Sequence, residues 1–182
     1  MGFRLSVQPL LPIGKGSLIY GSNDGGESYQ STHEEAKKIM EAVGRNLYLK
    51  THICQDKEGG KHTIVGPADI EVHQGGDGHI YAIDAARLMP PDLNIEKPNS
   101  IFYQHFRPEF MKCYKKPLNS DAYSRFGILG KEIHNKEALE ASRVLREERV
   151  PKFASTLKIP ADKEQNLNWV GSEMRRKGIN AR

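Results

Sequence analysis

The sequence predicts an α+β fold, in which N-terminal antiparallel strands and hairpins with one helix precede a helical C-terminal half. Three observations predict it. Up to about residue 92, short runs of alternating apolar residues are separated by turns rich in glycine and aspartate. One amphipathic stretch, residues 32–47, interrupts these runs, and after residue 107 apolar residues recur at helical spacing. The length of 182 residues suits one domain that spans residues 1–182.

The first elements are two strands, predicted at residues 4–13 and 17–22 on either side of a Gly-Lys-Gly turn. Prolines push the first of them toward a sheet edge. A helix follows at residues 32–47, because Thr32 and Glu35 form a capping box. Its apolar face carries Ala36, Ile39, Met40, Val43 and Leu47. Extended chain is expected from about residue 47 to 54, and a polar turn leads into another strand near residue 62.

The stretch at residues 69–92, DIEVHQGGDGHIYAIDAARLMPPD, predicts a β-hairpin. Ile70 and Val72 alternate with polar residues, and so do Ile80 and Ala82. The segment QGGDG between the two runs supplies glycines for the positive φ angles of a tight turn. Asp84 should lie near the end of the second strand, after which prolines break regular structure.

Helices are expected throughout the C-terminal half. Pro108 suits a first helical turn, Pro151 ends one helix and can start another, and Gly178 suits the residue just after a helix end. The predicted helices are 107–114, a short one at 119–126 opened by Asn119 or Ser120, 136–149 capped by Asn135, 151–157, and 163–177 opened by Asp162 with Gln165.

Composition excludes a membrane-spanning chain. The mean hydropathy is −0.62, and no apolar run approaches the roughly 18 residues that a span needs. Cys54 and Cys113 lie far apart and are expected to be reduced thiols, which predicts a cytoplasmic protein. Charge is uneven: residues 1–102 hold 10 Lys/Arg and 13 Asp/Glu, whereas residues 103–182 hold 17 and 10. The second half is therefore the part expected to meet an anionic partner.

The predicted hairpin concentrates ionisable residues, and one interpretation is a phosphotransfer site. In kinase-like folds, a catalytic Asp, a metal-binding Asn and a second metal-binding Asp lie near a hairpin. Asp69, Gln74 and Asp84 could take these positions. Gln74 stands where an Asn is expected, however, and no Phe-Gly follows Asp84.

A second interpretation of the hairpin is a zinc site, because facing residues at a hairpin tip lie within about 5 Å of each other. His73, Asp77 and His79 could converge there, with His62 or Glu71 as a fourth ligand. The structural alternative is that Asp77 and Gly78 make the turn, and this alternative is preferred. Neither a metal nor a cofactor is therefore expected.

The third interpretation makes the hairpin carboxylates architectural. Asp69 or Asp84 would then pair with Arg87 or Arg107, and loss of a buried partner would destabilise the fold. Nucleophilic hydrolysis has little support, because the chain has no Gly-x-Ser-x-Gly and neither cysteine lies in a recognisable motif.

Two basic segments are candidates for RNA contacts, since Lys and Arg pair with phosphates and aromatic rings stack on bases. They comprise Lys112, Lys115 and Lys116 beside Tyr114, and Arg175, Arg176 and Lys177. The alternative is a solvated helix face, because cations at a helix C-terminus also favour the helix dipole. No RRM, KH or zinc-knuckle signature is present.

Five blocks, taken in order, resemble the CLU domain of the clustered mitochondria family, from Gly2 to Arg182. They read GFRLSVQPLLPI with SLIYGSNDGG, ADIEVHQGGDGHIYAIDAARLMPP, FRPEF, PLNSDAYSRF and RRKGIN. In the family, Gly usually replaces Val72, Arg replaces His79, Phe replaces Ala85, and a His stands near Arg175. The chain is expected to be a fragment of a larger protein or a short relative.

The resemblance implies a non-enzymatic domain of a cytosolic, mRNA-associated protein involved in mitochondrial distribution and in translation of mitochondrial proteins. Partners in the translation machinery are implied as well. The family's hallmark block contains Asp69, Glu71, Gly76, Asp77, Gly78, Asp84 and Arg87. Two alternatives stay open: a kinase-like phosphotransferase or nucleotide binder, and a scaffold that binds only proteins.

Overall fold

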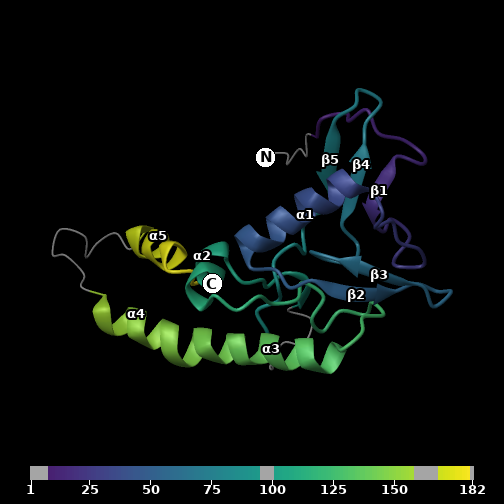
Figure 1. Cartoon of the computed structure of the whole chain (residues 1–182). Helices are drawn as coiled ribbons and strands as arrows, with labels where there is room; N and C mark the ends of the chain where they lie inside the picture. Colours follow the sequence, from purple (N-terminus) through teal and green to yellow (C-terminus); the bar gives the residue numbers. More distant parts are fainter. Residues whose placement is uncertain (1–7, 95–100, 158–167, 181–182) are drawn as a thin grey trace, which may run out of the picture.

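The computed structural model of the chain describes residues 8–94, 101–157 and 168–180. Strands occupy the first half and helices dominate the second, so the predicted α+β fold is confirmed (Figure 1). The strands form two small antiparallel sheets. One has the order β1-β4-β5, and the other pairs β2 with β3. The strands are β1 (Leu18–Gly21), β2 (His52–Gln55), β3 (Lys61–Ile64), β4 (Glu71–Gln74) and β5 (Ile80–Ile83).

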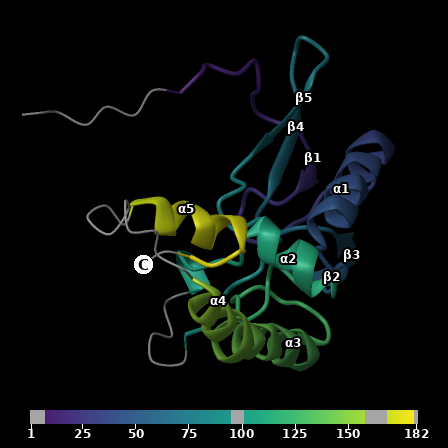
Figure 2. The same cartoon turned by 90° about the vertical axis from the view of Figure 1, so that its left-hand side faces the viewer.

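The helices are α1 (Glu34–Leu47), α2 (Pro108–Tyr114), α3 (Lys131–Arg143), the π-helix η2 (Val144–Arg149), α4 (Val150–Thr156) and α5 (Asn168–Arg176). Helix α1 lies against the sheets, while α3, η2 and α4 form one continuous rod along the opposite side (Figures 1 and 2). None of the helices within the described ranges is both long and apolar enough to cross a membrane.

Helix α1 begins one residue later than the capping box predicts. His33 is the N-cap, and its Nδ1 accepts a hydrogen bond of 3.3 Å from the Ala36 amide, so Thr32 does not cap the helix. Ala36, Met40 and Gly44 form the buried stripe at a spacing of four residues, whereas Ile39 is 42% exposed. The predicted apolar face is therefore correct except at Ile39.

The hairpin of β4 and β5 is confirmed, with Glu71 opposite Ile83 and Gln74 opposite Ile80. The Gly78 amide donates to the Gly75 carbonyl, and Gly78 itself has φ +82°. A type I turn followed by a left-handed residue closes three-residue hairpin loops in this way, and glycine adopts that conformation without steric cost.

The strand predicted at residues 4–13 is wrong where the structure tests it. Residues 8–13 form no strand, and residues 1–7 lie outside the described residues. The two prolines remove backbone donors at Pro9 and Pro12, which weakens any ladder in this segment. The strand predicted at residues 17–22 is confirmed as β1.

Two helical predictions in the second half are also wrong. Residues 119–126 form turns, because the Asn119 side chain accepts from the Asp121 amide at 2.8 Å and closes a local bend. Helix α3 begins at Lys131 after the left-handed Gly130. Asn135 lies inside it, and its side-chain oxygen accepts from the Tyr123 amide instead of capping a helix.

Pro151 does not end the helix that precedes it. The chain passes from α3 into the π-helix η2, in which the Val150 amide donates to the Leu145 carbonyl, five residues back. The wider π turn accommodates the missing proline donor and its bulky ring. The predicted helix 151–157 is thus α4, joined to α3 without a break.

Helix α5 ends at Arg176, and Gly178, with φ +76°, lies just after the helix end as predicted. The Gly178 amide donates to the Arg175 carbonyl, and the Ile179 amide donates to the Met174 carbonyl. These are the two hydrogen bonds of a Schellman motif. The predicted opening residue Asp162 lies outside the described residues.

Two main apolar clusters fill the interior. The first joins α1 to both sheets through residues that include Tyr20, Met40, Ile64 and Ile70. The second joins α2 to the helical rod and the C-terminal segment; its buried members are Phe106, Phe110, Met111, Leu118, Ala141, Leu145 and Ile179. The described fold therefore has a strand-rich part and a helix-rich part with separate cores.

Gly21→Ala tests the close approach of β1 to the segment before β4. Gly21 has φ +91°, and a Cβ there would lie 1.7 Å from the Ile70 carbonyl oxygen. Backbone strain of this kind costs about 1–3 kcal/mol, so we expect urea denaturation to show at least that loss. Gly14→Ala is the control, because its Cβ would meet no atom within 4 Å. Equal stability of the two variants would contradict the packing described here.

Candidate functional site

A buried carboxylate, Asp121, links the hairpin to the two-stranded sheet. Its side chain is fully buried, and one oxygen, Oδ2, lies 2.9 Å from Nε2 of His52 and accepts from the Ala68 amide at 2.8 Å. The other oxygen, Oδ1, lies 3.5 Å from Nη2 of Arg87. Each carboxylate oxygen therefore has a partner from another part of the chain.

Backbone pairing brings Asp121 to this position. Leu49 and Leu118 form a parallel bridge, and the Lys50 amide donates to the Leu118 carbonyl at 2.8 Å. Residues 118–121 therefore run beside the entry into β2 and place Asp121 over His52. The partners of the Asp121 side chain could not be predicted from the sequence, because we expected residues 119–126 to form a short helix.

Arg87 binds two carboxylates at once. Its Nε donates to Asp69 at 3.2 Å, and its Nη2 donates to the second oxygen of the same carboxylate. Its guanidinium also lies 5.2 Å from the ring centroid of Phe126. The pair of Asp69 and Arg87 considered in the sequence is thus formed, with side chains 29% and 17% exposed. Arg107 pairs with Glu109 instead.

The hairpin separates Gln74 from the other two residues considered for phosphotransfer. Asp69 and Asp84 flank the open end of the hairpin, since they lie just before β4 and just after β5. Gln74 is exposed at the turn end, about 16 Å along the strand from Asp69 at 3.3 Å per residue. Asp84 is also exposed and adopts a left-handed backbone with φ 53°. Among the described residues, Gln74 does not converge with the two aspartates.

Asp77 organises the hairpin tip. Its carboxylate accepts from the Tyr81 hydroxyl at 2.6 Å and from the His79 amide at 3.1 Å. The hydrogen bond from Tyr81 is the main reason that the pKa of Asp77 is lowered. Nδ1 of His79 lies 3.3 Å from the same carboxylate, but the His79 side chain is 77% exposed.

The histidines considered for zinc do not meet. His73 is buried, with Nδ1 2.9 Å from the Ser17 hydroxyl and Nε2 3.0 Å from Glu71. This chain of contacts ties β1 to β4, and the Ser17 hydroxyl donates to the Gly14 carbonyl at 2.6 Å. His62 pairs with Asp56, away from the hairpin.

A basic cleft of about 390 Å³ lies between the helical rod and the C-terminal segment. It is lined by Cys113, Arg149, Lys152, Phe153, Thr156, Arg176, Lys177 and Ile179. Figure 2 shows α5 above α4 with α2 beside them, so three segments that are far apart in sequence form its walls. Four cationic side chains therefore surround one half-buried aromatic ring.

Two cations of the basic cleft are free to meet a ligand. Arg176 is held by Glu173, with Nε and Nη2 at 3.1 and 2.6 Å from one oxygen. Arg149 donates to the Cys113 carbonyl at 3.4 Å. Lys152 and Lys177 are exposed and form no ion pair within the described part of the chain.

The structure brings only part of the predicted basic set to this cleft. Arg176 and Lys177 line it, while Arg175 donates to the Gly171 carbonyl. The remaining predicted lysines, Lys112, Lys115 and Lys116, do not line it; Lys116 pairs with Glu140. We did not predict Arg149, Lys152 and Phe153 from the sequence, although their spacing of three and four residues places them on one helix face.

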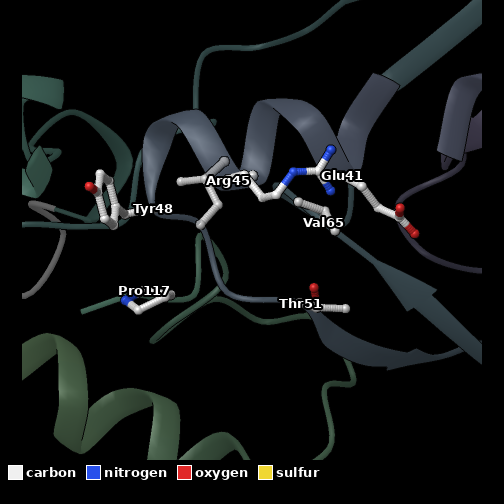
Figure 3. A pocket seen from close by; sticks show the side chains of 8 residues that line it. Glu41, Arg45, Tyr48, Thr51, Val65 and Pro117 are labelled. Carbon is white, nitrogen blue, oxygen red and sulfur yellow. The ribbon is translucent and has the colours of Figure 1, made fainter. Parts of the chain in front are cut away.

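A cavity of about 480 Å³ beside α1 has a different character. Figure 3 shows Glu41 and Arg45 reaching from α1 on one side, with Thr51 and Pro117 on the other. Val65 and Leu49 complete an apolar wall. This mixture lacks the concentration of positive charge found in the basic cleft.

Comparison with known proteins gives one consistent result. A family model described as Clustered mitochondria (CLU) matches residues 1–95. The chain is 30% identical over 126 residues to the clustered mitochondria protein homolog of Neosartorya fischeri, covering 63% of the chain and 10% of that relative. It is 32% identical over 77 residues to the homolog of Mycosarcoma maydis, covering 42% of the chain and 5% of that relative.

The homolog of Aspergillus oryzae is 27% identical over 126 residues, again 63% of the chain and 10% of the relative. The chain thus spans about a tenth of the length of the curated relatives that it matches first. No solved structure matches the chain significantly.

Arg87→Ala tests the linkage between the hairpin and Asp121. The change leaves the buried Asp121 and the half-buried Asp69 without their arginine, so we expect a loss of about 3 kcal/mol in unfolding free energy. This figure is at the low end for a buried pair because the Arg87 side chain is 17% exposed. Arg125→Ala is the matched control, since Arg125 is exposed and forms no ion pair with another described residue. An unchanged melting temperature in Arg87→Ala would contradict the linkage.

Proposed function

The chain belongs to the clustered mitochondria (CLU) family, and we propose that it acts there as a non-enzymatic, RNA-binding module in the distribution of mitochondria. The family name of its relatives supports the mitochondrial part of this proposal. RNA binding rests on the basic cleft, and on the uneven charge that makes residues 103–182 the cationic half.

The observation that carries the RNA proposal is the placement of Phe153 among Arg149, Lys152, Arg176 and Lys177. Single-stranded nucleic acids are bound by such combinations, because cations neutralise the phosphates while an aromatic face stacks on a base. Lys152 and Lys177 can each approach a phosphate without first breaking an ion pair within the described residues.

Arg149 and Arg176 have a supporting role in this proposal. Arg176 is fixed by Glu173, and Arg149 is fixed by the Cys113 carbonyl. A guanidinium with one side already held still has donors left for a phosphate, since it carries five N–H groups. The two arginines therefore supply orientation, and the two lysines supply most of the salt-sensitive attraction.

The acidic hairpin is proposed to be architectural. Asp69 is held by Arg87, and Asp77 is held by Tyr81 and the His79 amide. Carboxylates in such contacts support the fold. We propose a cytoplasmic location and contacts with the translation machinery on the same grounds of family membership.

Removal of the two free lysines should weaken RNA binding. We expect the double variant Lys152→Gln, Lys177→Gln to bind a labelled single-stranded RNA of mixed sequence several-fold more weakly in fluorescence anisotropy. Each phosphate contact contributes roughly 0.7 to the slope of log affinity against log salt, so the slope should fall by about 1.4.

The matched control is Lys38→Gln, Lys61→Gln, which removes the same charge from exposed lysines on α1 and β3. This control should bind like the parent chain. Equal losses of RNA affinity in both variants would mean that net charge, and not the cleft, accounts for binding. If the parent chain binds no RNA at low salt, the proposal is contradicted and the alternative of a protein-binding scaffold is favoured. Thermal stabilisation by ATP with magnesium that disappears in Asp84→Asn would favour a nucleotide binder.

A further inference from the structure

Three side chains with metal-binding atoms face one another in the interior of the strand-rich part. His52 and Cys54 lie two residues apart in β2 and project from the same face. Together with a carboxylate oxygen of Asp121, their donor atoms all lie within 4.8 Å of one another. The three residues are 4%, 0% and 0% exposed. This cluster is separate from the histidines of the hairpin.

A fourth donor, Tyr29, borders the same cluster. The residue is 5% exposed, and its hydroxyl points to the Cys54 thiol, with which it interacts. Burial is the main reason that the pKa of Tyr29 is raised, and the neighbouring Cys54 adds to the effect. A thiol is a weak hydrogen-bond acceptor, so the Tyr29 hydroxyl keeps an oxygen lone pair that is available to a metal ion.

The His52 ring lies between two hydrogen-bond acceptors. Nε2 lies 2.9 Å from Asp121 and Nδ1 lies 3.5 Å from the Lys50 carbonyl. Both neighbours are acceptors, and a neutral imidazole can donate to only one of them. Metal-bound histidines resolve this arrangement, because one nitrogen binds the ion while the other donates to a carbonyl.

We propose that His52, Cys54, Asp121 and Tyr29 bind a zinc ion. A Cys54 thiolate and the Asp121 carboxylate balance the double charge of the ion, while neutral His52 and the Tyr29 hydroxyl complete four ligands. The thiol proton passes to solvent when the Zn–S bond forms. Ligand atoms of a tetrahedral zinc site lie about 3.5 Å apart, so the cluster must contract by roughly 1 Å.

Groups around the cluster support this ligand set. The Ala68 amide and Arg87 hold the Asp121 carboxylate, and the Lys50 carbonyl faces the free nitrogen of His52. Such outer contacts orient the ligands of a metal. The sulfur and imidazole donors favour zinc over magnesium or calcium, which prefer oxygen. Four protein ligands would close the site, which is typical of a structural zinc.

Zinc uptake by the full 182-residue chain tests this proposal. After chelator treatment and dialysis, zinc is titrated against a coloured competing chelator, and we expect one ion per chain and a higher melting temperature. Cobalt in place of zinc should give a thiolate-to-cobalt charge-transfer band. Cys54→Ser should remove this band and weaken zinc binding at least tenfold. Cys113→Ser is the matched control, because it changes the exposed cysteine only.

Tyr29→Phe separates metal binding from folding. It deletes a hydroxyl whose contact with the Cys54 thiol is a weak one, so the metal-free protein should keep most of its stability while zinc binding weakens about tenfold. This variant decides the matter if Cys54→Ser does not fold. Absence of zinc uptake by the parent chain at micromolar concentrations would overturn the proposal, and so would equal zinc affinities of Cys54→Ser and Cys113→Ser.

Discussion

The buried carboxylate of Asp121 is the interaction on which the arrangement of the chain depends. Its oxygens form hydrogen-bond contacts with three groups. These are the His52 ring in the two-stranded sheet, the Ala68 amide in the segment before the hairpin, and the Arg87 guanidinium in the segment after it. An ionised group without water is costly unless each oxygen has a partner. These three segments are therefore held in one mutual position, although they come from distant parts of the sequence.

The two halves of the chain differ in how their charged side chains are placed. Several carboxylates in the first half make internal contacts, such as those of Asp69 with Arg87 and of Asp77 with Tyr81. Positive charge in the second half gathers where α4 and the end of α5 approach each other, and two of its lysines remain exposed. The strand-rich part therefore pairs some of its charges internally, whereas the basic cleft leaves positive charge exposed to solvent.

The sequence predicted what local chemistry determines. The hairpin followed from glycines at the turn, and the end of α5 followed from Gly178, because these signals act within a few residues. Asp121 and the basic cleft could not be predicted in this way. Asp121 meets His52 across 69 positions, and the cleft joins residues of three helices. The predicted start of α3 was wrong because Asn135 is a residue type that often caps helices. Its side-chain oxygen instead accepts a hydrogen bond from the Tyr123 amide.

The π-helix at Val144–Arg149 determines the direction in which the side chains of α4 point from the helix axis. A π turn accommodates one more residue than an α turn, so side chains beyond it are rotated by about 100° from their positions in an uninterrupted α-helix. Lys152 and Phe153 face α5 because of that rotation. The turn therefore determines which residues of α4 line the cleft: substitutions that convert it to a regular α turn of the same length would rotate the same side chains away from α5 while leaving their chemistry intact.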